Sequence, residues 1–272
     1  YAVNADFTPV DTANYNSLSG ASAGNFVIQK AGTPTLSVSN SPLIFNGAAQ
    51  AAVVVGSVPG TVSNINYNGS ATVPANAGSY VITADFTPVD TVNYDSLVGA
   101  TAGTLVIQQA ATTTAVTCAA GPFTYTGATQ TPCTAAVSGP GGLNQALTVV
   151  YAGNTNAGTA SASAAFGGDA NYLPSSNGTT FTIGKATPSL AVTDSPVPYD
   201  GTPKTAAVSS SVPGTVSDIR YNGSANAPAD AGTYAITADF VPIDTTNYNT
   251  LGGAHAGNFV IQKAGTPTLS VS

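Results

Sequence analysis

The 272-residue sequence predicts an all-β protein, built as a tandem array of small antiparallel β-sandwich domains. Three observations carry this prediction. An internal repeat accounts for the whole chain, apolar and polar residues alternate with a period of two, and 29 glycines with 18 prolines disfavour long helices. A hydrophobic content of 43% is enough for packed cores and argues against a disordered chain.

The repeat is visible as a recurring octapeptide, Gly-Asn-Phe-Val-Ile-Gln-Lys-Ala, at 24–31 and again at 257–264. Residues 1–39 also match residues 234–272 at 31 of 39 positions, so the array has a higher-order period of three repeats. We therefore expect the chain to be a window on a longer array. Cutting after each terminal alanine gives a partial repeat (1–31), a first repeat (32–110), a divergent middle repeat (111–186), a last repeat (187–264) and the first strand of a further repeat (265–272).

Within a repeat, the hydrophobic pattern is that of short strands. Residues 233–240 alternate strictly, which is typical of a strand with one buried face. One face carries Tyr234, Ile236, Ala238 and Phe240, and the other carries Thr237 and Asp239. Similar segments lie around 190–192, 207–208, 219–221 and 259–261, separated by Gly, Pro, Asn and Asp turns. Six or seven such strands in under 80 residues favour a small antiparallel sandwich.

An ordered series of short motifs gives the repeat a recognisable signature. In the last repeat it runs Tyr-Asp-Gly at 199–201, Tyr-Asn-Gly-Ser at 221–224, Ala-Gly-Thr-Tyr at 231–234, Asn-Tyr at 247–248 and Phe-Val-Ile-Gln-Lys-Ala at 259–264. This series resembles the bacterial Ig-like repeat families MBG and YDG. The resemblance implies Ig-like sandwiches in large secreted or surface-anchored proteins, where such repeats form stalks. It implies no catalytic residues.

The middle repeat holds the two cysteines of the chain, Cys118 and Cys133. Alignment on the aromatic residue that follows the first strand puts Cys118 opposite Val38 and Val192, and Cys133 opposite Val53 and Ala207. Both cysteines thus take apolar positions, which predicts that they point inward and form a disulfide. A spacing of 15 with no third cysteine or partner histidine suits neither a zinc site nor a redox motif. A disulfide indicates an oxidising, extracellular compartment.

The small number of charges excludes several functions. Charged residues make up 6% of the chain, with 12 aspartates, five basic residues and a net charge of −7, so nucleic-acid binding is excluded. No apolar run is long enough for a membrane span. Because His and Glu are nearly or wholly missing, we expect no catalytic residues and no cofactor. The single histidine, His255, replaces Ser22 and Thr101 of the sister repeats and is interpreted as a surface variation.

Two further sets of residues are considered as sites. Paired aspartates recur in a loop pattern, Ala-Asp-Phe-x-Pro-x-Asp-Thr, but two carboxylates are few for calcium, and we interpret them as turn residues with no metal. The pairs are Asp6/Asp11, Asp85/Asp90 and Asp239/Asp244. Lys30, Lys185 and Lys263 precede the repeat boundaries, and because the first repeat has Gln109 there, solvated lysines are favoured over an isopeptide cross-link.

Two functions remain open. The first is a non-catalytic segment of a bacterial extracellular stalk or filament: short Pro-containing links between repeats favour an extended rod, and low charge favours lateral or end-to-end packing with other copies. The alternative is an adhesin module that binds a glycan or a cell-surface protein. A cluster of exposed tyrosines would favour adhesion, whereas aromatics at framework positions are expected in the core. These framework aromatics are Phe86, Phe166, Phe240, Tyr94, Tyr172 and Tyr248.

Overall fold

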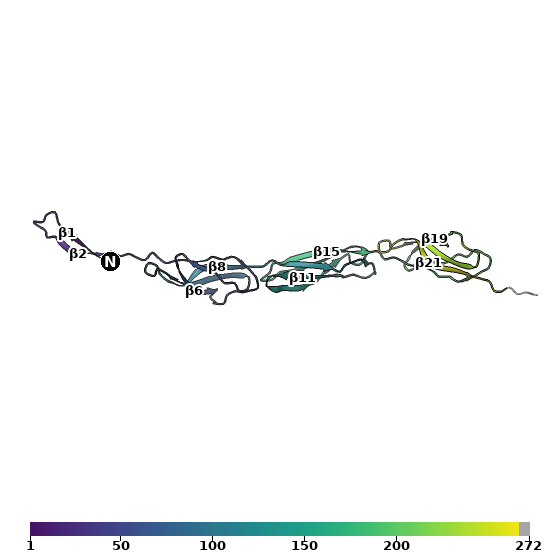
Figure 1. Cartoon of the computed structure of the whole chain (residues 1–272), viewed down its shortest axis with the longest axis horizontal. Coiled ribbons are helices and arrows are strands. Elements are labelled where there is room, and N and C mark those ends of the chain that lie inside the picture. Colours follow the sequence, from purple (N-terminus) through teal and green to yellow (C-terminus); the bar gives the residue numbers. More distant parts are fainter. Residues whose placement is uncertain (267–272) are drawn as a thin grey trace, which may run out of the picture. The chain divides into compact units, whose positions relative to one another are not determined.

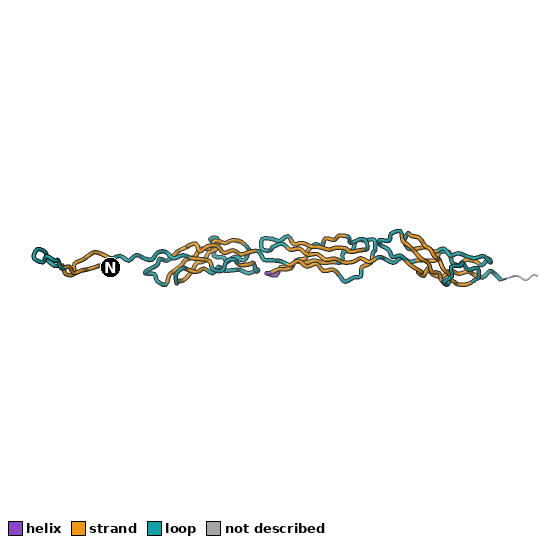
Figure 2. Tube along the Cα trace, turned by 90° about the horizontal axis from the view of Figure 1, so that it is seen from above, coloured by secondary structure: helices purple, strands orange, loops and turns teal. Residues whose placement is uncertain are grey.

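The computed structural model describes residues 1–266 of the chain. It consists of strands and connecting loops, and the one helical segment in this range is the short 3-10 turn η1 (Pro140–Gly142) (Figure 2). The chain forms two compact units, each described below by itself. The first unit holds 1–112 with 139–143 and 167–174, and the second holds 113–138, 144–166 and the chain from 175 onward.

The first unit begins with a hairpin formed by the partial repeat. Its strands β1 (Ala2–Phe7) and β2 (Leu18–Asn25) pair antiparallel and are almost entirely exposed (Figure 1). Phe7 and Leu18, which lie opposite each other in this pair, are 60% and 53% exposed. The same positions in the first repeat, Phe86 and Leu97, also pair with each other, but there Phe86 is 1% exposed. The hairpin therefore has the strand pairing of the last two strands of the first repeat but leaves its apolar residues exposed.

The first repeat forms a sandwich of two sheets. A two-stranded sheet pairs β3 with β5, and a four-stranded sheet has the order β4-β8-β7-β6. The strands are β3 (Leu36–Val38), β4 (Leu43–Ile44), β5 (Val54–Gly56), β6 (Gly60–Tyr67), β7 (Gly78–Pro88) and β8 (Leu97–Gln108). Alternate residues of β7 and β8 face the core, including Ile82, Phe86 and Leu105 at 0–1% exposure. Gly60 is required beside this core, because a Cβ there would lie 2.3 Å from the Phe86 ring.

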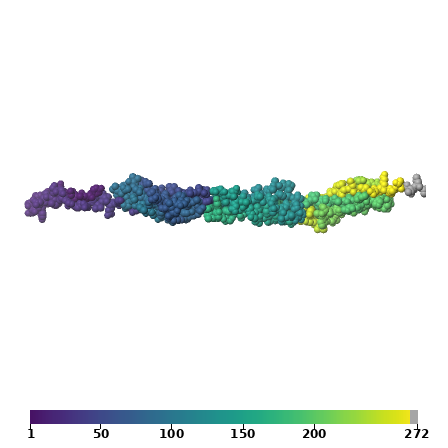
Figure 3. Space-filling view, turned by 90° about the horizontal axis from the view of Figure 1, so that it is seen from below, coloured from purple at the N-terminus to yellow at the C-terminus, as the bar shows by residue number. Residues whose placement is uncertain are grey.

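The last repeat, in the second unit, repeats this arrangement. Its sheets pair β16 with β18 and have the order β17-β21-β20-β19. The strands are β16 (Leu190–Val192), β17 (Val197–Pro198), β18 (Val208–Ser210), β19 (Gly214–Tyr221), β20 (Gly232–Pro242) and β21 (Leu251–Gln262). β21, yellow in Figure 3, lies along the green strands of the same repeat. The predicted alternation is confirmed on β20, where Ile236, Ala238 and Phe240 are fully buried.

The middle repeat has a larger first sheet. Strands β12, β11 and β9 form a three-stranded sheet, which packs on a four-stranded sheet of order β10-β15-β14-β13. The strands are β9 (Thr113–Cys118), β10 (Phe123–Thr124), β11 (Cys133–Gly139), β12 (Leu143–Leu147), β13 (Val150–Ala152), β14 (Gly158–Phe166) and β15 (Ser175–Gly184). Its core is made of smaller side chains, because β14 presents Ala160 and Ala162 where β20 presents Tyr234 and Ile236.

One strand of each sandwich departs from the antiparallel prediction. The short strands β4, β10 and β17 each pair parallel with the last strand of their own repeat. In the first repeat, four residues separate the end of β3 at Val38 from the start of β4 at Leu43, so the chain changes sheet without reversing direction. In the other sheet β4 runs in the same direction as β8, so the two strands pair in parallel. The remaining strand pairs are antiparallel, as predicted.

Candidate functional site: the junctions between repeats

Each repeat carries a loop in which an aspartate organises an Asn-Tyr pair, and we call these the junction loops (11–15, 90–94, 169–172 and 244–248). In loop 90–94, Asp90 accepts the Val92 and Asn93 backbone N–H groups and the Asn93 side-chain amide, at 3.2, 3.0 and 2.8 Å. The Asn93 amide is also the main cause that lowers the pKa of Asp90. Such bonds between an aspartate and the N–H groups that follow it fix a turn locally. The loop is therefore shaped by its own sequence.

The other aspartates of the repeated pairs hold neighbouring strands together. Asp85 on β7 accepts the Gly99 N–H at 2.7 Å and the Asn64 side-chain amide at 2.7 Å, and these bonds lower its pKa. Asp239 accepts the Gly253 N–H at 2.7 Å in the last repeat. These carboxylates thus point to N–H donors of their own repeat. Within residues 1–266, no group of three or more His, Cys, Asp or Glu side chains is placed to hold a metal ion.

Within the first unit, junction loop 169–172 packs on the first repeat. The Ala77 N–H donates to Asn171 Oδ1 at 2.8 Å, and the Ala110 N–H donates to the Asn171 carbonyl at 2.9 Å. The Tyr172 ring stands edge-on to Phe45, with ring centroids 5.2 Å apart, and Tyr172 is 8% exposed. One asparagine and one tyrosine therefore join this loop to the repeat that precedes it in sequence.

Within the second unit, junction loop 244–248 packs on the middle repeat in the same way. The Ala157 N–H donates to Asn247 Oδ1 at 2.8 Å, and the Ala186 N–H donates to the Asn247 carbonyl at 2.8 Å. Tyr248 stands edge-on to Tyr125, with ring centroids 5.4 Å apart. Asn247 is 6% exposed, one of the few buried polar side chains. The bond to the asparagine side chain, the bond to the asparagine carbonyl and the aromatic contact thus recur at equivalent positions of the two junctions.

We call the surface that takes a junction loop the receiving face. It consists of an aromatic residue after the first strand, an Asn-Ala-Gly or Asp-Ala-Gly loop, and the last two residues of the repeat. The three receiving faces are Phe45, 76–78 and 109–110 in the first repeat; Tyr125, 156–158 and 185–186 in the middle repeat; and Tyr199, 230–232 and 263–264 in the last repeat.

The residues before the boundary alanines contribute to these junctions. Gln109 donates to the Asp169 carbonyl at 2.6 Å, and Lys185 donates to the Thr245 carbonyl at 2.7 Å. Lys30 donates to the Tyr94 carbonyl at 3.4 Å and forms an ion pair with Asp95 at 2.8 Å. Lys30 and Lys185 are exposed, and each also donates a hydrogen bond to a backbone carbonyl, which the interpretation as solvated lysines did not include. A glutamine and a lysine can both donate to a carbonyl, which explains why either residue serves at this position.

A close approach of backbones completes the first junction. Gly47, in the turn after Phe45, has φ +82°, and a Cβ there would lie 2.4 Å from the Gly141 Cα of turn η1. The Tyr172 hydroxyl donates to the Pro140 carbonyl of the same turn at 2.6 Å. Glycine is therefore required at position 47 both for its backbone conformation and for its contact.

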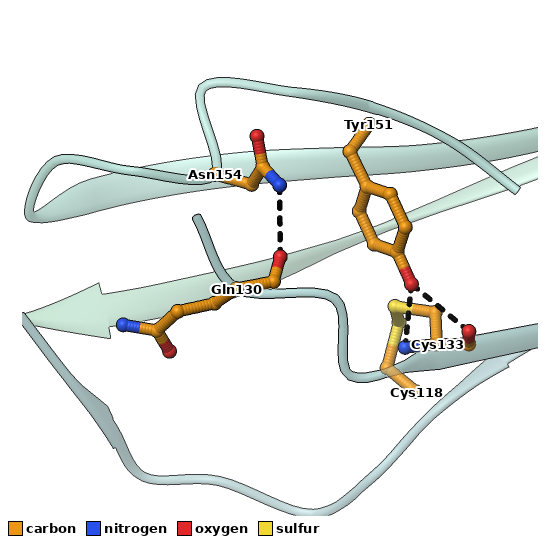
Figure 4. The surroundings of a disulfide bond; sticks show 5 residues. All are labelled: Cys118, Gln130, Cys133, Tyr151 and Asn154. Atoms are coloured by element: carbon orange, nitrogen blue, oxygen red, sulfur yellow. Dashed lines mark hydrogen bonds between the residues drawn. A yellow bond between two sulfur atoms is a disulfide. The ribbon is translucent and has the colours of Figure 1, made fainter. Parts of the chain in front are cut away.

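The two cysteines of the middle repeat form a disulfide (Figure 4). Cys118 on β9 and Cys133 on β11 are register partners, and their Cα atoms are 3.8 Å apart, closer than the expected 5.5–6 Å. The Tyr151 hydroxyl bonds to both the N–H and the carbonyl of Cys133, at 2.8 and 2.9 Å. Since these groups bond to Tyr151, the cysteines occupy a non-hydrogen-bonded pair, where opposite strands approach most closely.

The sequence alignment used for Cys133 needs a correction. Cys133 is buried, but Val53, its aligned counterpart, is 51% exposed, and Ala207 is exposed as well. The residue that pairs with Val38 is Val54, one position later than the alignment implied. The middle repeat has one residue fewer between Gln130 and β11 than the first repeat has between Gln50 and β5. Cys133 therefore takes the strand position of Val54 and not that of Val53.

The framework aromatics divide into two groups. Phe86 and Phe240 lie in the cores of their own repeats, as expected. Tyr172 and Tyr248 do not, because their rings pack on aromatics of the preceding repeat. His255 is exposed on β21, where its Nδ1 accepts the Gly257 N–H at 3.2 Å.

The fold and the junctions define a class: tandem Ig-like β-sandwich repeats joined through their ends. The chain belongs to the MBG domain family, whose model matches residues 35–112 and 189–265. These matches fall on the first and last repeats. MBG domains are non-enzymatic repeat domains, typical of extracellular or surface proteins. No curated protein and no solved structure matches the chain. Among residues 1–266 there is no helix long and apolar enough to cross a membrane.

Proposed function

We propose that this chain is a non-catalytic structural segment of an extracellular stalk or filament. The observation that carries the proposal is the recurrence of one junction: a junction loop fills the receiving face of the preceding repeat in each unit, with equivalent hydrogen bonds and ring contacts. A connection that repeats along a chain transmits force from repeat to repeat and limits bending between neighbours. An extended array built in this way suits a stalk.

The distribution of exposed tyrosines supports a structural function over adhesion. Tyr1, Tyr15 and Tyr199 are the tyrosines with large exposed fractions in the described part of the chain, at 82%, 67% and 39%. Each lies at a position that an aromatic also occupies in a sister repeat, so these are framework residues rather than a special binding cluster. A cluster of exposed tyrosines particular to one repeat would favour adhesion instead.

The disulfide is consistent with assembly outside the cytoplasm. It crosslinks two strands of the middle repeat, whose core is built from alanines and is poorer in large side chains than its sisters. Disulfides persist in oxidising compartments, and small domains with modest cores benefit most from them.

Immunogold electron microscopy of cells that produce the protein tests the proposal. Antibodies raised against the chain should label extended structures outside the cell, at regular intervals if the array is long. Label confined to the cytoplasm, or an enzymatic activity in the purified chain that follows its concentration, would contradict a structural function. Label concentrated only at contacts with a host surface would instead favour the adhesin alternative.

A further inference from the structure

The junction between the middle and last repeats differs from the first junction in its aromatic pair. Tyr248 of junction loop 244–248 stands edge-on to Tyr125, with ring centroids 5.4 Å apart, whereas Tyr172 meets Phe45 in the first junction. Each of the other close ring pairs within residues 1–266 contains at least one phenylalanine. Tyr125 and Tyr248 are therefore the one close pair of phenols in the described part of the chain.

Hydrogen bonds hold the Tyr248 ring beside the Tyr125 ring. Asn247 Oδ1 accepts the Ala157 N–H at 2.8 Å, and the Asn247 carbonyl accepts the Ala186 N–H at 2.8 Å. Both bonds attach the residue before Tyr248 to the middle repeat. Groups that a fold keeps together react with each other as if their concentration were high. A reaction between these two rings is therefore favoured over a reaction between separate chains.

No hydrogen bond opposes a turn of either ring. The Tyr125 and Tyr248 hydroxyls form no hydrogen bond with another group of residues 1–266, and both side chains are half-buried, so each is partly in contact with solvent. In the first junction, by contrast, the Tyr172 hydroxyl is held by the Pro140 carbonyl at 2.6 Å. A turn of the edge-on rings can therefore bring together the carbons that lie beside the Tyr125 and Tyr248 hydroxyls.

The composition of the chain directs oxidation to tyrosine. Cysteine thiols and methionine are readily oxidised side chains, but the chain has no Met, and its two cysteines are joined in the disulfide. Trp, whose indole also gives up an electron readily, is absent from the sequence too. The 12 tyrosines are thus the side chains from which an oxidant removes single electrons most easily. The disulfide itself indicates an oxidising compartment.

We propose that Tyr125 and Tyr248 are a site of oxidative cross-linking, in which a dityrosine bond joins the middle repeat to the last repeat. The oxidant is hydrogen peroxide acting through a haem peroxidase. Each phenol gives up one electron and its hydroxyl proton, and the peroxide is reduced to two molecules of water. The two phenoxyl radicals join through the carbons beside their oxygens. The hydrogens on those carbons then move to the oxygens, which restores both phenols.

This bond adds a covalent link to a junction that is otherwise held by hydrogen bonds and a ring contact. The proposal goes beyond the proposed stalk function, because it names a chemical reinforcement at one junction and the residues that form it. The first junction cannot be linked in this way, since the phenylalanine at position 45 has no hydroxyl and forms no phenoxyl radical.

Oxidation of the dilute 272-residue chain with hydrogen peroxide and a haem peroxidase, followed by tryptic digestion and mass spectrometry, tests the proposal. Cleavage after Lys and Arg places Tyr125 in peptide 31–185 and Tyr248 in peptide 221–263. The unaltered chain should yield these two peptides joined, at their summed mass less two hydrogen atoms, with the blue fluorescence of dityrosine. The joined fraction should stay constant over about a tenfold dilution, since both rings belong to one chain.

Conservative variants assign the bond. Tyr125→Phe and Tyr248→Phe should each abolish the joined peptide, because each removes one phenol and keeps the ring. Tyr94→Phe is the matched control and should leave the yield unchanged, because Tyr94 takes the position of Tyr248 in loop 90–94 but has no close ring partner within residues 1–266.

Absence of the joined peptide from the oxidised, unaltered chain would overturn the proposal. So would a yield that Tyr248→Phe does not lower, or one that falls in proportion on dilution. These results would leave the stalk function untouched, since that function is tested by localisation on cells.

Discussion

Replacing Asn247 with alanine removes the side chain that joins the last repeat to the middle repeat. Asn247 Oδ1 accepts the Ala157 N–H at 2.8 Å, and Asn247 is 6% exposed. Without this acceptor the partly buried N–H is left without a partner, which costs about 1–3 kcal/mol. If the N–H opens to solvent independently of its repeat, this loss corresponds to hydrogen exchange that is roughly 5- to 150-fold faster.

The assay is amide hydrogen exchange, followed residue by residue in the full chain. Exchange at Ala157 should accelerate in Asn247→Ala, while exchange at Ala77 should not change, since Ala77 is bound by Asn171. Asn171→Ala should give the reverse. Asn93→Ala is the matched control, because Asn93 makes the same bonds to its own aspartate but its Oδ1 accepts no N–H in the described part of the chain. Equal exchange at Ala157 in the unaltered chain and in Asn247→Ala would refute the junction.

Three further predictions concern stability. Cys133→Ala should destabilise the middle repeat by about 3 kcal/mol, the loop-closure value for a 15-residue separation, and leave the other repeats unchanged in calorimetry. Because hydrogen bonds from Asn93 and Asn247 lower the pKa of Asp90 and Asp244, their loops are stabilised above the usual aspartate pKa of about 3.9. The protection of the Asn93 and Asn247 amides, measured against the intrinsic exchange rate at each pH, should therefore fall as the pH drops below that value, and a protection factor that stays constant down to about pH 2 would contradict this. Unfolding curves with calcium and with a chelator should superimpose, whereas stabilisation by calcium would identify a metal site.

The strands of the last repeat could be predicted from the sequence because their pattern is local. Alternation at 233–240 marks a half-buried strand, and β20 buries the expected face. The short parallel strands were not predicted, since the direction of a two-residue strand depends on which sheet the chain joins. The periodicity of the sequence does not indicate which sheet such a short strand joins.

The junctions could not be predicted because recurrence does not identify a partner. Tyr172 and Tyr248 recur at one position of the repeat, and so do the core residues Phe86 and Phe240. The pattern shows that the position requires an aromatic ring, but not whether the ring enters its own core or packs on the preceding repeat. The aspartate that precedes each Asn-Tyr pair was a usable signal, because an asparagine held in a fixed turn presents its side chain outward.

The most direct test of the account is a nuclear Overhauser effect between ring protons in the full chain with selectively labelled tyrosines. The Tyr125 and Tyr248 rings stand edge-on, with centroids 5.4 Å apart. The account predicts a cross-peak between these two rings, and its loss in Asn247→Ala if the asparagine holds the loop in place. Two tyrosine rings that show no cross-peak in the folded, unaltered chain would contradict the claim that consecutive repeats are joined through their junction loops.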